Sequence, residues 1–137
     1  MTEYMPNYCD NNLTIMGPSG EIARFVKEKL DFNVFVPPPE DAERDWFSEH
    51  WGTSNRRDDI EIEQRDSNWA QFKFITAWAP PIPFCRAILK KYPECWIKHE
   101  FTVDMMALSG IWIGEITKTG EITEQVMEWE VPWQRYC

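Results

Sequence analysis

Paired cysteines and clustered histidines are missing from this sequence. Its four cysteines lie far apart and form no C-x-x-C pair, and its two histidines are His50 and His99. A zinc cluster would need ligands gathered from the whole chain, so we expect no metal and no cofactor. The cysteines are interpreted as reduced thiols packed like small apolar side chains. A Cys85–Cys95 disulfide is the alternative, which a cytosolic setting disfavours.

Long apolar runs are also absent. No stretch approaches the roughly 20 apolar residues that a membrane-spanning helix needs. Residues 1–6 are neither basic nor followed by an apolar run, so no signal peptide is expected. We therefore expect a cytoplasmic protein, and its 137 residues suit a single domain, 1–137, with a buried core.

Positive charge is scarce. The chain has 14 lysine and arginine residues against 23 aspartates and glutamates, which gives a net charge of −9. Proteins that bind nucleic acids gain affinity by neutralising phosphates, so this balance argues against direct binding of DNA or RNA and against an anionic membrane surface. It favours a partner with a basic surface.

What is present is a regular alternation of apolar and polar residues, interrupted by turn residues. Strands have a period of two and amphipathic helices a period near 3.6, so the two patterns can be separated along the chain. Ser19, after Gly17-Pro18, offers an N-cap for the first helix. In chain order, the pattern predicts a strand over 8–16, a helix from Ser19 to Leu30, an apolar loop over 31–39, a short helix over 40–51, a strand around Ile60 and Ile62, a strand over 69–78, a helix over 82–92, a strand over 96–103, and a hairpin of 111–116 with 122–127.

The stretch TAWAPP, residues 76–81, marks a corner. Its two prolines cannot continue a sheet ladder, but proline is favoured in the first turn of a helix. The sequence therefore ends a central strand at Trp78 and begins the second long helix at a fixed angle. In that strand, Phe72 and Phe74 share one face and are predicted to point into the core.

The order of these elements is β-α-(loop and short helix)-β-β-α-β-β-β. Its first six elements, without the insertion, are those of a ferredoxin-like split βαβ, an α+β fold in which two helices cover one face of an antiparallel sheet. The insertion covers about 31–57, and the C-terminal hairpin extends the sheet. An acidic, tryptophan-bearing tail covers about 124–137.

Five landmarks occur in a distinctive order. They are MPNYCDNNLT at 5–14, Gly17-Pro18, Phe32-Asn33 ahead of a valine and proline loop, Trp51-Gly52-Thr53, and TAWAPP at 76–81. This order resembles the YubB-type family with a ferredoxin-like domain, small proteins carried by plasmids and phages. The resemblance spans residues 5 to about 120 and implies the ferredoxin-like fold, a mobile genetic element and a bacterial host, but no particular activity. The chain departs from the family at Ala79, where the family usually has a serine.

Aromatic and small polar residues predict one candidate ligand pocket. Tryptophan walls with a few converging polar groups are typical of small-ligand sites. The alternative is a structural cluster, because tryptophans at strand ends often cover a core and asparagines near a strand start often bond to nearby backbone. The candidate pocket residues are Asn7, Asn12, Trp51, Thr53, Thr76 and Trp78.

Catalytic signatures are missing, so we predict that the protein is not an enzyme. Glu49 and His50 adjoin in sequence, but neighbours on a helix point apart. No nucleophile elbow or phosphate-binding glycine loop occurs. His99 lies in an alternating strand and is interpreted as a core histidine. An RNA-binding sheet needs a basic residue, glycine and exposed aromatics on its central strand, which 69–76 does not supply.

Tryptophan is abundant, at eight residues, and part of it is interleaved with carboxylates. Tryptophan anchors protein interfaces, and carboxylates speed the encounter with a basic partner; a solvated charged face is the alternative. We predict a non-enzymatic phage or plasmid protein that binds a host protein and inhibits a host defence or nucleic-acid-handling complex. The second hypothesis is a domain that binds or sequesters a nucleotide or metabolite, and the sequence leaves monomer and homodimer open. The predicted partner surface consists of Trp46, Glu49, Glu124, Glu128, Trp129, Glu130 and Trp133.

Overall fold

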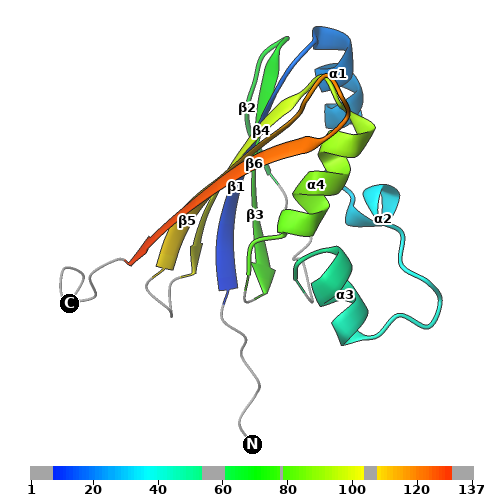
Figure 1. Ribbon diagram of the computed structural model, residues 1–137, viewed down its shortest axis with the longest axis vertical. Coiled ribbons are helices and arrows are strands. Elements are labelled where there is room, and N and C mark those ends of the chain that lie inside the picture. The colour runs from blue at the N-terminus through cyan, green and yellow to red at the C-terminus, as the bar shows by residue number, and fades with distance from the viewer. Residues whose placement is uncertain (1–7, 54–60, 78, 104–107, 131–137) are drawn as a thin grey trace, which may run out of the picture.

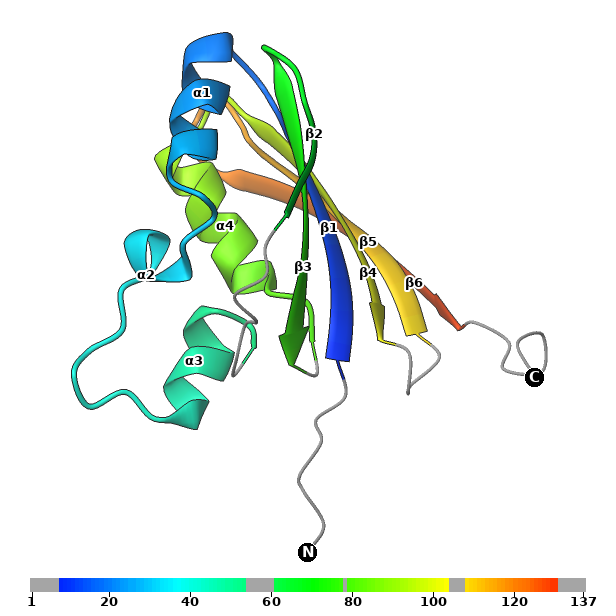
Figure 2. The same ribbon diagram turned by 180° about the vertical axis from the view of Figure 1, so that it is seen from behind.

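The computed structural model describes residues 8–53, 61–77, 79–103 and 108–130. Within these ranges six strands form one antiparallel sheet, and the helices lie together on one of its faces (Figure 1). Figure 2 shows the same two layers from behind. The elements are β1 (Tyr8–Met16), α1 (Ser19–Lys27), α2 (Phe32–Phe35), α3 (Arg44–His50), β2 (Glu61–Arg65), β3 (Trp69–Ala77), α4 (Ile82–Lys91), β4 (Trp96–Val103), β5 (Leu108–Ile116) and β6 (Ile122–Glu130).

The strand order in the sheet is β2-β3-β1-β4-β5-β6. Its first four strands have the order of a ferredoxin-like fold, with β1 between β3 and β4, so the predicted split βαβ is confirmed. The last two strands pair from Leu108↔Glu130 to Ile116↔Ile122 and extend the sheet, as the hairpin pattern predicts. No helix among the described residues is long and apolar enough to cross a membrane.

One face of the sheet forms the core. On β3, Phe72 and Phe74 point to this face and are buried, as the alternation predicts. α1 contributes Ile22 and Phe25 to the core, because the two lie three positions apart on one helix face. The other core residues from the strands and α4 are Leu13, Ile15, Ala70, Phe84, Cys85, Ile88, Leu89, Ile97 and Trp112.

The start of α1 differs from the prediction. Pro18 occupies the N-cap position, no side chain caps the helix, and Ser19 is already helical. Proline has no side-chain acceptor, so the first helical N–H groups of α1 receive no side-chain cap. At the other end, Lys29 and Leu30 both have φ of 55°, which turns the chain into the insertion.

The insertion contains a helix that the sequence pattern did not predict. Asp31 accepts a hydrogen bond from the Asn33 backbone N–H at 2.9 Å, which caps the four-residue α2 inside the expected loop. Phe32 stacks on Phe84 of α4 with ring centroids 3.7 Å apart. The corner after β3 agrees with the prediction, because α4 begins after Pro81 and has Pro83 in its first turn.

Candidate functional site

The predicted pocket residues Trp51 and Thr53 lie in a packed cluster. Trp51 is 8% exposed, and its indole Nε1 donates to the Val36 carbonyl at 2.9 Å. Thr53 Oγ1 donates to the Ala77 carbonyl at 2.7 Å and accepts from the Ala77 N–H at 3.1 Å. The indole and the hydroxyl are therefore bonded to backbone atoms of neighbouring segments.

A buried polar network contains Thr76 and Asn11 instead of Asn12. Asn11 Nδ2 donates to Thr76 Oγ1 at 2.9 Å and to the Cys9 carbonyl at 3.0 Å, and Thr76 Oγ1 donates to the Ala79 carbonyl at 2.7 Å. Asn11 shares its face of β1 with Cys9 and the core, whereas Asn12 points to the opposite face. The structure thus separates Asn12 from the other described members of the predicted pocket. Asn7 and Trp78 lie outside the described residues.

His99 completes this network in the core. Its Nε2 lies 2.8 Å from Asn11 Oδ1. Because both Asn11 amide hydrogens are already donated, Oδ1 must accept, which assigns the proton to Nε2. His99 Nδ1 is buried and has no hydrogen-bond partner in the described part of the chain. Burial lowers the pKa of His99 to about 3, so the ring is neutral at pH 7.

The sheet face opposite the helices carries a shallow concavity of about 580 Å³. Asn12 is one of its lining residues, and the buried Oδ1 of Asn12 has no hydrogen-bond partner among the described residues. Thr102 and Ser109 bond to each other through their hydroxyls at 2.9 Å, and Trp129 forms one wall. Sequence analysis missed this site because its residues come from five strands, β1, β3, β4, β5 and β6, although the alternation of β1 places Asn12 on this face. The other lining side chains on this face are Asp10, Lys73, Ile75, Glu100 and Ile111.

The predicted partner surface is divided between two elements. Trp46 and Glu49 lie on α3, where Trp46 is half-buried and stacks on His50 with ring centroids 4.5 Å apart. Most of the others lie on β6, which contains the predicted strand over 122–127 and continues it to Glu130, so residues 128–130 of the expected tail also form a paired strand. Trp133 lies outside the described residues.

β6 is the outermost strand of the described sheet, and most of its side chains are exposed. Val126, Met127 and Trp129 are 58%, 66% and 47% exposed. Strand alternation places Val126, Glu128 and Glu130 on the helix side and Met127 and Trp129 on the concave side. We call these five residues the β6 surface.

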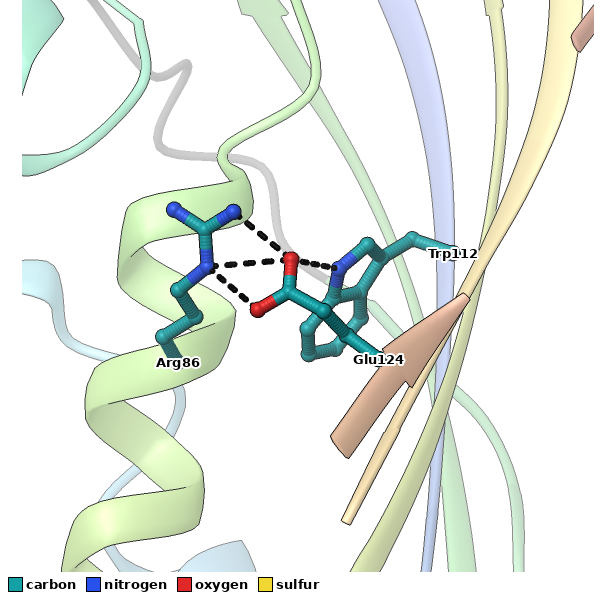
Figure 3. Close-up of polar contacts among 3 residues, drawn as sticks. All are labelled: Arg86, Trp112 and Glu124. Carbon is teal, nitrogen blue, oxygen red and sulfur yellow. Dashed lines mark hydrogen bonds and ion pairs between the residues drawn. The ribbon is translucent and has the colours of Figure 1, made fainter. Parts of the chain in front are cut away.

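Glu124 has a structural role that sequence analysis missed. Arg86 of α4 donates to its carboxylate from Nη2 at 2.7 Å and from Nε at 2.9 Å, and the Trp112 indole donates at 3.2 Å (Figure 3). The Arg86 hydrogen bonds hold the pKa of Glu124 below its usual range, with a smaller contribution from Trp112. Glu124 therefore links β6 to α4 and β5 through hydrogen bonds, and its carboxylate is less available to a partner.

Cys85 and Cys95 are buried thiols that form no disulfide, so the alternative Cys85–Cys95 disulfide is wrong, and Cys9 is buried as well. Burial raises the pKa of Cys85 and raises that of Cys95 to about 11, which makes both poor nucleophiles. Within the described ranges, no three His, Cys, Asp or Glu side chains are placed to hold a metal ion.

Comparison with known proteins gives one family match. Residues 57–132 match the family model of the ferredoxin-like domain in Api92-like protein. The crystal structure of a protein api92 from Yersinia pseudotuberculosis is similar with a TM-score of 0.51 and 14% identity, over 61% of this chain. The match spans 35% of that longer chain, about a third of its length, and at this identity it shows the fold alone. A search of curated proteins finds no match.

Proposed function

Because the chain belongs to the family of ferredoxin-like domains in Api92-like proteins, whose fold does not by itself specify an activity, we propose its function from its surfaces. The proposal is a non-enzymatic binding protein that captures a partner protein with a basic surface through the β6 surface. Of the predicted partner surface, the proposal retains Glu128, Trp129 and Glu130 on β6. It assigns no partner contact to α3, because the Trp46 ring packs on His50 and on Trp51.

The observation that carries the proposal is the exposure of Val126, Met127 and Trp129 beside carboxylates on one strand. Residues 122–130 contain no lysine or arginine, whereas Glu128 and Glu130 are exposed there. Exposed apolar side chains next to charged ones mark interaction sites, and here Met127 and Trp129 lie on one face of β6 and Val126 on the other. The apolar side chains supply buried contact area in a complex, and the carboxylates favour a basic partner.

The partner that we propose is a host protein that handles nucleic acid. With a net charge of −9, the protein has the same sign of charge as a phosphate backbone. A basic groove that binds nucleic acid would therefore attract it. The resemblance to the YubB-type family, carried by plasmids and phages, suggests a bacterial host and inhibition of its defence.

The experiment is affinity capture from a nuclease-treated bacterial lysate, read by mass spectrometry. We compare the native chain with the double variant Glu128→Gln/Glu130→Gln and with Trp129→Ala. Both variants are expected to retain about tenfold less of one basic protein, and added NaCl should release it from the native chain.

The matched control removes two carboxylates elsewhere. Glu40→Gln/Asp41→Asn alters exposed residues between α2 and α3 and should retain the partner as the native chain does. Equal capture by the native chain and the Glu128/Glu130 variant, or capture that does not respond to salt, would show that another surface binds.

The concavity favours a second candidate function, binding of a small ligand. Its lining combines the unpartnered Asn12 Oδ1 with the Trp129 ring, which suits a flat ligand that carries a hydrogen-bond donor. Mass spectrometry of molecules released by heating the purified protein tests this candidate. A ligand enriched with the native chain and lost with Asn12→Ala supports it, and release of the same molecule from both proteins contradicts it.

A further inference from the structure

The two sides of β6 differ in chemistry, and this limits how a partner can contact both. Glu128 and Glu130 lie on the helix side of the sheet, whereas Met127 and Trp129 lie on the concave side. A partner resting on either face of the sheet would contact only one of these sets. The line where they meet is the outer edge of β6, beyond which no strand is paired among the described residues.

An added strand contacts both sets at once. Alternate side chains of a strand point to opposite faces of its sheet, so a segment paired with β6 would place one set beside the carboxylates and the other beside Met127 and Trp129. The nine residues of β6 are long enough for such a ladder, and the outward backbone N–H and C=O groups of an edge strand provide its hydrogen bonds.

The charge pattern decides between a second copy of this chain and a different segment. Two copies of β6 paired antiparallel about Val126 would set Glu124 opposite Glu128, and a parallel pair would align each glutamate with itself. Like charges directly opposite each other are destabilising in a sheet. A segment with lysine or arginine opposite Glu128 and Glu130, and apolar residues between them, has complementary charge.

On this basis, and resting on the proposed function, we propose that the partner binds by β-augmentation: an extended segment with basic residues at alternate positions adds a seventh strand to the sheet at the β6 edge. Main-chain hydrogen bonds supply affinity that is independent of side chains, and the alternation of carboxylates and apolar residues on β6 selects the segment.

A defined peptide tests this mode of binding. The probe is acetyl-KVKVTTK-amide, and the control is the same peptide methylated on its backbone nitrogens, which keeps the charge and removes the main-chain donors. Amide hydrogen exchange of the ¹⁵N-labelled protein is followed by NMR. The expected result is slower exchange at every second amide of β6 with the probe only, and about tenfold weaker binding of the control.

Each other outcome has a definite meaning. Equal binding of both peptides, or binding without slower exchange in β6, overturns strand addition but leaves partner capture through the β6 surface intact. Failure of the probe to bind overturns the inference, while the capture experiment independently decides the proposed function. A dimer in sedimentation, with alternate β6 amides protected in the absence of peptide, would show that a second copy occupies the edge.

Discussion

At the scale of single residues, buried polar side chains in this core are satisfied by a few named neighbours. Asn11 joins Thr76 of β3 to His99 of β4, although Asn11 and His99 are 88 positions apart. His99 Nδ1 differs, because it is a buried acceptor without a partner among the described residues. Protonating that atom would put an unpaired charge in the core, which makes the stability of the protein sensitive to pH.

The first prediction concerns this pH sensitivity. The pKa of His99 is about 3 in the folded protein and about 6.5 in an unfolded chain, so the unfolded state binds more protons between these values. Stability from His99 is fully present above pH 6.5 and is lost as the pH falls below it. Urea unfolding should show a free energy of unfolding about 2 kcal/mol lower at pH 5 than at pH 8, because pH 5 lies about 1.5 pH units below the pKa of the unfolded histidine. The His99→Gln variant should lack most of this loss, whereas His50→Gln, at an exposed position, should keep it.

The second prediction separates a structural cluster from a pocket at Trp51. The indole is buried against Phe32 and Phe47, with ring centroids 5.2 and 4.6 Å away. Trp51→Ala should lower the free energy of unfolding by about 3–5 kcal/mol, because it leaves a cavity and an unpaired Val36 carbonyl. Trp51→Phe, which preserves most of the packing, should cost less. A stable Trp51→Ala protein in a denaturant titration would contradict the structural interpretation.

At the scale of elements, the ends of helices and strands are fixed by local backbone conformation and by a few cross-element contacts. Two successive left-handed residues, Lys29 and Leu30, follow the C-cap of α1. α4 is tied to α1 by Lys91 and Tyr92, which both bond to the carboxylate of Glu28. These elements thus meet at one cluster directly after α1.

The third prediction uses the end of α1. Lys29 is exposed with φ of 55°, a conformation that glycine adopts without the Cβ penalty. Lys29→Gly should therefore raise the free energy of unfolding by up to about 1 kcal/mol. Ala23→Gly, at an exposed position inside α1, should lower it by about 1 kcal/mol. Thermal unfolding of both variants checks the opposite signs, and a destabilised Lys29→Gly protein would refute the argument.

The fourth prediction concerns the fastening of β6. Removing the Glu124 carboxylate breaks its paired hydrogen bonds with Arg86 and its contact with the Trp112 indole. Glu124→Ala should cost about 1 kcal/mol, since both partners are partly exposed. The amides of β6 should exchange faster, while those of β1 keep their native rates. Glu128→Ala, on the same strand, is the control and should leave β6 exchange unchanged.

At the scale of the whole molecule, the period of two specifies much of the fold. It correctly places Phe72 and Phe74 in the core and β5 beside β6 across a turn whose Gly120 has φ of 89°. α2 escapes prediction because four residues are too few to show a helical period. The contact of Glu124 with Arg86 cannot be predicted either, because alternation identifies a strand but does not show which helix packs against it.

The candidate sites show the same limit. Residue types select Thr53 and Thr76 as hydroxyls of a candidate ligand pocket, but only the structure shows that both hydroxyls donate to backbone carbonyls. The concavity that Asn12 helps to line depends on the side-by-side order of five strands, which is a long-range property. The β6 carboxylates are visible in sequence, while their separation from Met127 and Trp129 follows from pairing.

The fifth prediction concerns the net charge of −9. Self-repulsion destabilises the compact state, and salt screens it, since the Debye length falls from about 30 Å at 0.01 M to about 8 Å at 0.15 M. The melting temperature should therefore rise between these NaCl concentrations. The Glu40→Gln/Asp41→Asn variant carries less charge and should respond less. A melting temperature that falls with salt would mean that attractive pairs dominate.

The central position of β1 has a consequence for synthesis on the ribosome. β1 is synthesised before its neighbours β3 and β4. Its backbone groups therefore have no strand to pair with while the intervening chain is translated. β2 with β3, and β5 with β6, are joined by short turns and can pair as soon as they appear. Contacts between distant segments close slowly. The β2–β3 hairpin can therefore form before β1 is paired on both sides, and β1 depends on protection from other exposed strands until translation reaches Val103.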